Sequence, residues 1–242
     1  MRKPLTTILV ATTLLFSCQD SISATQKKIK PVWGYRFMVS GDFDGDGVKE
    51  NLTEHYFSRL DHKETNKFYE GIDDYDQTVA LTVKKEPYSF VISDNNLIDT
   101  LHISSEGQLL GLSYLKNEGD LNGDGTDEIS YVVNWADYSN MNIWHIVTYK
   151  NKKWTELYSF LIWDWQIPDL PETFSQNGPF GLENKIIDTK NDTINEQLER
   201  ELKEFKGLVK KVGTNKIRVT YRKERIDGDV EDTKIVNLKR LK

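Results

Sequence analysis

The sequence predicts a mainly β fold, and three observations support this prediction. Apolar and other residues alternate along several short stretches, which is the period of a strand with one buried face. Polar, turn-rich connections separate these stretches. An acidic, glycine-containing segment occurs twice, 78 residues apart, each time just before a predicted strand. With 242 residues, 38% of them hydrophobic, the chain has enough apolar material for a globular core.

The predicted elements follow the chain in order. Strands are expected over 33–39, 78–83, 88–92, 129–135, 144–149, 154–160, 217–221 and 235–238. Lys84 to Pro87 and Lys150 to Lys153 are expected as the turns of two hairpins, and Asp227 to Asp229 as a third turn. Between them a loop is expected over 166–181 and a helix over 191–206, from an N-cap at Asp192 to a stop at Gly207.

The order of these elements divides the chain. Acidic loop, strand, long connection, strand, turn and strand occur over 42–92 and again over 120–160, which indicates a repeated unit. A β-repeat domain is therefore expected over 31–165. A C-terminal segment of loop, helix and β-hairpin is expected over 166–242, and it could pack on the same domain.

The first residues have the pattern of an export signal. Arg2 and Lys3 precede an apolar run, "ILVATTLLF", that is too short to span a bilayer as a helix. The run leads into "LFSC", which ends at Cys18, the only cysteine. This stretch resembles the lipobox of bacterial lipoproteins. The resemblance implies a signal peptide over 1–17, lipidation of Cys18, a tether over 18–30 and a membrane-anchored place in the bacterial cell envelope, at the outer membrane or cell surface. The alternative is an ordinary signal peptide.

The two acidic segments read "GDFDGDGVKEN" from Gly41 and "GDLNGDGTDEI" from Gly119. Counted from the first Asp of each, the loops match at positions 1, 3, 5, 6 and 9, where position 6 is a glycine, Gly47 or Gly125, that permits a sharp turn. The expected ligands occupy positions 1, 3, 5, 7 and 9. They are Asp42, Asp44, Asp46, Val48 and Glu50 in the first loop, and Asp120, Asn122, Asp124, Thr126 and Glu128 in the second. Ca²⁺ takes six to eight oxygen ligands in flexible geometry, so alternate side chains, the carbonyl at position 7 and a carboxylate at position 9 suit it. We therefore expect two structural Ca²⁺ sites.

Other metals and the EF-hand fit this spacing less well. Mg²⁺ demands stricter octahedral geometry and keeps its waters, and Zn²⁺ favours His or Cys ligands. Position 12, where an EF-hand has its bidentate Glu, holds Thr53 or Tyr131. A strand rather than a helix is expected after each loop. The non-metal alternative is a pair of polar turns, because Asp and Gly favour turns by themselves.

The pattern D-x-[DN]-x-D-G-x-x-[DE], leading into a strand, resembles the FG-GAP and related VCBS-type repeats. This resemblance implies Ca²⁺ bound between strands of propeller-like β units. Only two copies are present, so we expect a partial or divergent propeller-like arrangement, since most closed propellers have at least four blades.

The sequence carries no catalytic signature that we recognise, neither a G-x-S-x-G elbow nor an H-E-x-x-H motif. A net charge of −6 gives no reason to expect nucleic acid as a partner. We expect an envelope-anchored calcium-binding lipoprotein with a binding or structural role and an unidentified protein or glycan partner. The alternative is an envelope hydrolase or carbohydrate binder. Trp163 and Trp165 are expected in the core; exposed, they would suit stacking on sugars.

Overall fold

The computed structural model describes residues 28–72, 74–168 and 199–238. The predicted signal peptide, Cys18, most of the tether and the predicted N-cap Asp192 lie outside the described residues. The helix expected over 191–206 is therefore described only in part, and residues 199–204 are helical. Among the described residues, no helix is long and apolar enough to cross a membrane.

The described chain is mainly β, as predicted. Its first strands are β1 (Lys30–Val32), β2 (Met38–Gly41), β3 (Glu50–Ser58), β4 (Lys63–Glu64), β5 (Phe68–Glu70), β6 (Pro87–Ser93) and β7 (Leu101–Ser104). The later strands are β8 (Leu109–Gly119), β9 (Glu128–Trp135), β10 (Met141–Lys150), β11 (Lys153–Trp163), β12 (Val209–Gly213), β13 (Lys216–Lys223) and β14 (Val230–Asn237). The helical elements include α1 (Tyr75–Lys84) and the short 3₁₀ helix η1 (Asp164–Gln166).

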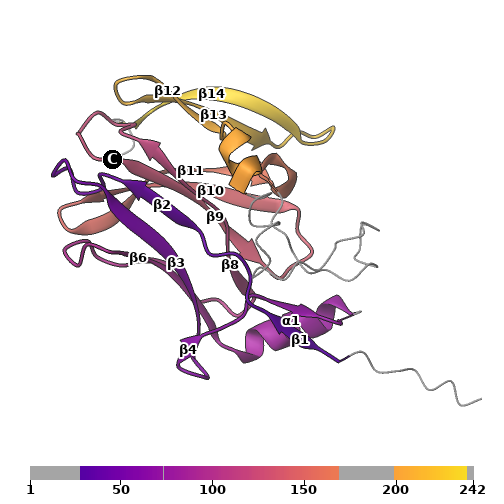
Figure 1. Ribbon diagram of the computed structural model, residues 1–242. Coiled ribbons are helices and arrows are strands. Elements are labelled where there is room, and N and C mark those ends of the chain that lie inside the picture. Colours follow the sequence, from indigo (N-terminus) through magenta and orange to yellow (C-terminus); the bar gives the residue numbers. More distant parts are fainter. Residues whose placement is uncertain (1–27, 73, 169–198, 239–242) are drawn as a thin grey trace, which may run out of the picture.

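The strands of the described residues form four sheets. A five-stranded sheet has the order β2-β3-β6-β7 with β4 paired to β3, and a four-stranded sheet has the order β11-β10-β9-β8. A three-stranded sheet, β12-β13-β14, and a two-stranded sheet, β1-β5, complete the set. Figure 1 shows the four-stranded sheet between the sheet that contains β2 and β3 and the C-terminal sheet. Among the described residues these sheets do not close into a barrel or a propeller.

Two of the three apolar clusters in the described residues hold the three larger sheets together, one on each face of the four-stranded sheet. Alternate residues of β9 enter different cores: Ile129, Tyr131 and Val133 pack in the first, and Val132 packs in the second. The first core also contains side chains of the β2-β3-β6-β7 sheet, and the second contains side chains of the C-terminal sheet. β9 is therefore a central strand buried on both faces, and the C-terminal sheet packs directly on the repeat region.

The predicted strand over 78–83 is wrong, because these residues belong to α1. The helix begins after Asp74, whose side chain accepts a hydrogen bond from the backbone of Asp76, as an N-cap does. Along α1 the less exposed residues are Tyr75, Thr78, Val79, Leu81 and Thr82, most of them at helical rather than strand spacing. The second half of that predicted hairpin is confirmed as β6.

The strand predicted over 33–39 is wrong over most of its length, since β2 begins only at Met38. Gly34 has a φ of +82°, and a Cβ built there would lie 2.8 Å from the Cβ of Lys67. The chain therefore turns at Gly34 and passes close to Lys67 instead of continuing as a strand.

The later elements follow the prediction more closely. β10 and β11 form the expected hairpin, and Lys150 pairs with Lys153. Asn151 and Lys152 both have positive φ, as a two-residue hairpin turn requires. β13 and β14 pair in one register from Lys216 to Lys223, and Gly228 has a φ of +117° in the turn between them.

Candidate functional site

Both acidic segments connect two antiparallel strands. The first joins β2 to β3, where Gly41 pairs with Glu50. The second joins β8 to β9, where Gly119 pairs with Glu128. The two loops therefore start and end at the same positions relative to their strands, so the sequence repeat is also a structural repeat. We call them the first loop (residues 42–50) and the second loop (residues 120–128).

The first carboxylate of each loop closes a turn on backbone N–H groups. Asp42 accepts hydrogen bonds from the backbone of Gly45 at 2.8 Å and of Gly47 at 3.0 Å. Asp120 accepts one from the backbone of Gly123 at 2.5 Å. These turns are local side-chain-to-backbone hydrogen bonds, of the kind that Asp commonly forms in turns.

Positions 3, 5 and 7 form matching hydrogen bonds in the two loops. The backbone N–H of Asp46 donates to Asp44 Oδ1 at 3.2 Å, and that of Asp124 donates to Asn122 Oδ1 at 2.8 Å. The backbone N–H at position 7 donates in the same way to the carboxylate at position 5. Val48 donates to Asp46 Oδ1 at 2.7 Å, and Thr126 donates to Asp124 Oδ1 at 3.3 Å. The loops therefore share one backbone shape.

Glycine at two positions allows this shape. Gly47 and Gly125, at position 6, have φ values of +87° and +93°, which confirms the predicted sharp turn there. Gly45 and Gly123, at position 4, also have positive φ, +79° and +81°. The role of position 4 was missed, although both sequences carry the glycine.

Position 9 anchors each loop to the core. Glu50 is 3% exposed, and its Oε2 accepts the backbone N–H of Phe43 at 3.0 Å. Glu128 is fully buried, and its Oε2 accepts the backbone N–H of Leu121 at 2.6 Å. Burial raises the pKa of both carboxyl groups, that of Glu128 to about 7. Nearby Asp44 raises the pKa of Glu50 further.

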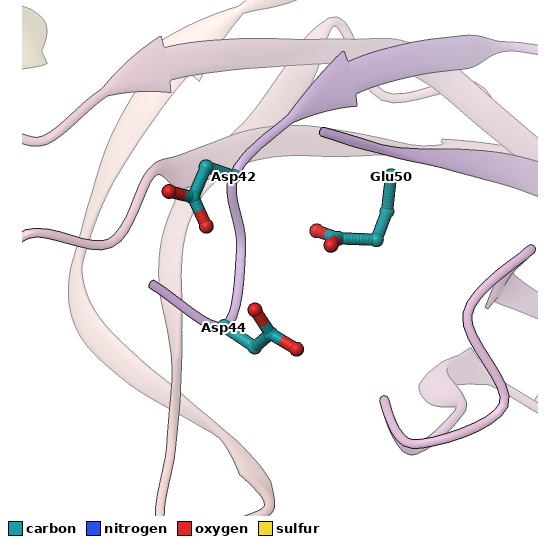
Figure 2. Close-up of side chains that lie close together, drawn as sticks. All are labelled: Asp42, Asp44 and Glu50. Atoms are coloured by element: carbon teal, nitrogen blue, oxygen red, sulfur yellow. The ribbon is translucent and has the colours of Figure 1, made fainter. Parts of the chain in front are cut away.

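The first loop gathers three carboxylates. One carboxylate oxygen from each of Asp42, Asp44 and Glu50 lies within 4.8 Å of the others. Figure 2 shows Asp44 and Glu50 directed toward each other, with Asp42 on the stretch that leads into the loop. Asn95 donates to Asp44 Oδ2 at 3.3 Å. Within the described part of the chain none of these three carboxylates has an ion-pair partner, and Asp46 does not belong to the group.

In the second loop, positively charged and amide side chains contact the acidic groups. Lys150 Nζ lies 3.2 Å from Asp124 Oδ2, and the Asn122 amide donates to Glu128 Oε1 at 2.6 Å. Lys211 of β12 donates to the carbonyl of Asp120. The pKa of Asp124 is lowered: burial is the largest single influence and raises it, but hydrogen bonds from Thr126 and the charge of Lys150 together outweigh it. In the second loop, the ammonium group of Lys150 from β10 therefore already compensates part of the negative charge.

The two loops touch each other. The backbone N–H of Asp127 donates to the carbonyl of Asp42 at 2.7 Å, and the backbone N–H of Asp42 donates to Asp127 Oδ2 at 3.2 Å. Asn117 donates to both Asp127 Oδ2 and the Ser40 carbonyl, at 2.8 and 2.9 Å. Asp127, at position 8, was not predicted as a site residue, and the first loop has Lys49 at that position.

The tryptophan pair expected in the core is not a core feature. Trp165 is 62% exposed, and its ring stacks on that of Trp163 with 5.1 Å between centroids. β11 ends at Trp163 and η1 follows, so Trp165 lies beyond the end of the strand.

Comparison with known proteins returned no match to a family model, to a curated protein or to a solved structure.

Proposed function

We propose that the two acidic loops bind Ca²⁺ and that the ion braces the junction of the two hairpins. The chain would then be a calcium-binding protein with a binding or structural role rather than a catalytic one. In this proposal the two loops are divergent FG-GAP or VCBS-type repeats, and they do not belong to a closed propeller.

The convergence of Asp42, Asp44 and Glu50 carries the proposal. Like charges a few ångströms apart repel strongly when one of them is buried and no counter-charge is present. A divalent cation removes this repulsion and uses the oxygens as ligands. Ca²⁺ suits a site built only from oxygen donors on a flexible loop. In the second loop, a bound ion would take the place of Lys150 at Asp124.

The place of action in this proposal is the bacterial cell envelope, through lipid attached at Cys18. It rests on the lipobox resemblance of the N-terminal sequence. Outside the cytoplasm, Ca²⁺ would be available to the folded domain. A ligand that binds only the folded state stabilises that state.

Thermal unfolding with and without calcium tests the proposal. At a Ca²⁺ concentration a hundredfold above Kd, the gain is about 2.7 kcal/mol, which raises the melting temperature by about 5–10 °C. Asp44→Asn should remove most of this rise, and Mg²⁺ at the same concentration should produce a smaller one.

Asp232→Asn is the matched control, because Asp232 is a partly exposed aspartate on β14 outside both loops. It should keep the full calcium-dependent rise. Equal melting temperatures in Ca²⁺ and in chelator would show that the loops are polar turns without a metal.

A further inference from the structure

A pocket of about 570 Å³ lies away from the acidic loops. It is lined by residues 30–33, 61, 63–66 and 70, which belong to β1, β4, β5 and the chain next to them. Its volume falls within the range of small-ligand sites, and it shares no residue with either loop. The pocket therefore needs an explanation separate from calcium.

Trp33 gives the pocket an exposed aromatic surface. The side chain is 42% exposed although it lines the pocket, so a large apolar ring remains in contact with water. The guanidinium group of Arg36 lies 4.6 Å from the ring centroid of Trp33. A cation over one face of an indole ring is a favourable contact and restrains the ring.

The backbone around Trp33 is also held firmly. Its carbonyl accepts hydrogen bonds from the backbone of Lys67 at 3.0 Å and from Arg36 Nη1 at 2.9 Å. Arg36 Nη2 donates to the Thr65 carbonyl at 2.6 Å, which links Arg36, and through it Trp33, to another residue of the pocket lining. The aromatic surface is thus preorganised for a ligand.

The charges that line the pocket nearly balance. Lys30 pairs with Glu70 at 3.3 Å, and Glu64 contacts both Arg36 and His55, at 3.8 and 2.5 Å. Lys30, Glu64 and Glu70 are therefore compensated within the protein. The remaining lining charges, on Asp61 and Lys63, are of opposite sign, so the lining does not favour a strongly charged ligand of either sign.

Polar groups for hydrogen bonding remain at the rim. Asp61 uses Oδ2 to accept the Ser58 hydroxyl at 3.0 Å, and its carboxylate has further acceptor capacity. Lys63 is exposed and offers three donor hydrogens. An exposed aromatic ring with neighbouring donors and acceptors suits a ligand with an apolar face and a polar edge.

We propose that this pocket binds a neutral sugar, whose ring stacks on Trp33 while its hydroxyl groups bond to Asp61 and Lys63. A pyranose presents C–H groups on one face and hydroxyl groups around its edge. The C–H face complements the electron-rich face of an indole, and the hydroxyl groups complement carboxylate and ammonium groups. The site is independent of calcium and would give the protein a glycan partner.

The purified protein, tested on an array of neutral, sulfated and sialylated oligosaccharides, checks this proposal. Wild type should bind at least one neutral glycan, in calcium and in chelator alike. Trp33→Leu, which keeps an apolar side chain but removes the aromatic ring, should weaken that binding at least about tenfold. Trp33→Tyr restores a ring and should bind within about threefold of wild type.

Trp165→Leu is the comparison variant, because Trp165 is also an exposed tryptophan that would suit stacking on sugars but lies outside the pocket. It should bind like wild type. Melting temperatures of all variants show whether each is folded, and the Tyr variant keeps the test valid if Trp33→Leu is unstable. Binding of charged glycans alone, binding of no glycan, or equal loss in Trp165→Leu and Trp33→Leu would overturn the proposal.

Discussion

Lys67 and Glu54 form an ion pair that is fully removed from water. Lys67 Nζ lies 2.6 Å from Glu54 Oε1, and both side chains are 0% exposed. Glu54 also accepts the backbone N–H groups of Phe37 at 3.1 Å and Leu112 at 2.8 Å. The carboxylate therefore joins the chain before β2 to β8 and satisfies buried donors on both sides.

Replacing Glu54 by Gln should destabilise the protein strongly. The buried Lys67 ammonium would lose its negative partner, and breaking such a pair typically costs about 3–5 kcal/mol. Urea denaturation measures the loss in the free energy of unfolding. Asp232→Asn removes one partner of the partly exposed Lys223 pair and should leave stability close to wild type. Equal effects of the two substitutions would contradict this account.

Lys85 predicts a pH dependence of stability. Burial is the main cause that lowers its pKa from 10.5 to about 7, and the charge of Arg36 lowers it further, while Asp61 opposes the change. Its Nζ donates to the Asn66 carbonyl at 2.7 Å and lies 4.5 Å from the ring centroid of Tyr69. Between pH 7 and 10.5 the unfolded chain holds more protons than the folded one, so this group makes stability rise with pH.

Urea denaturation at pH 7.5 and pH 9 checks this expectation. Wild type should gain stability from the lower to the higher pH, and Lys85→Met should gain less because the titrating group is gone. Lys84→Met, at an exposed neighbouring position, should keep the wild-type gain. The same gain in Lys85→Met and wild type would assign the pH dependence to another group.

At the scale of elements, local patterns predicted several strands correctly, but they missed others, among them the eleven-residue β8, and assigned a strand where the structure has a helix. The hairpin of β10 and β11 was predictable, because alternating residues flank a short polar turn. The stretch over 78–83 alternates in a similar way, yet it forms part of α1. A short apolar run does not distinguish a strand from a helix by its period alone. The sequence signal that favoured a helix here was Asp74, a good N-cap residue just before the run.

The acidic loops also show what local sequence patterns can and cannot predict. Their equal shape was predictable from matching residues at positions 1, 3, 5, 6 and 9. Their unequal charge environment was not, because Lys150 and Asn95 reach the loops from strands and turns far along the chain. The pocket lined by Trp33 was missed for the same reason, since residues 30–33 meet residues 61–70 there only after folding.

At the scale of the whole molecule, the four-stranded sheet organises the rest. Both of its faces are covered, and the second loop leads into β9, the strand that enters both cores. The first loop leads into β3 and touches the second loop through Asp127. An ion in these loops would therefore brace the place where two of the sheets meet (Figure 1).

Isothermal titration of the calcium-free protein with Ca²⁺ measures the central claim directly. We expect two bound ions per chain, with the first loop the tighter site because its carboxylates have no cation of their own. Asp44→Asn should remove the tighter site and leave the other. No calcium-dependent heat in wild type, or an unchanged tight site in Asp44→Asn, would contradict the account.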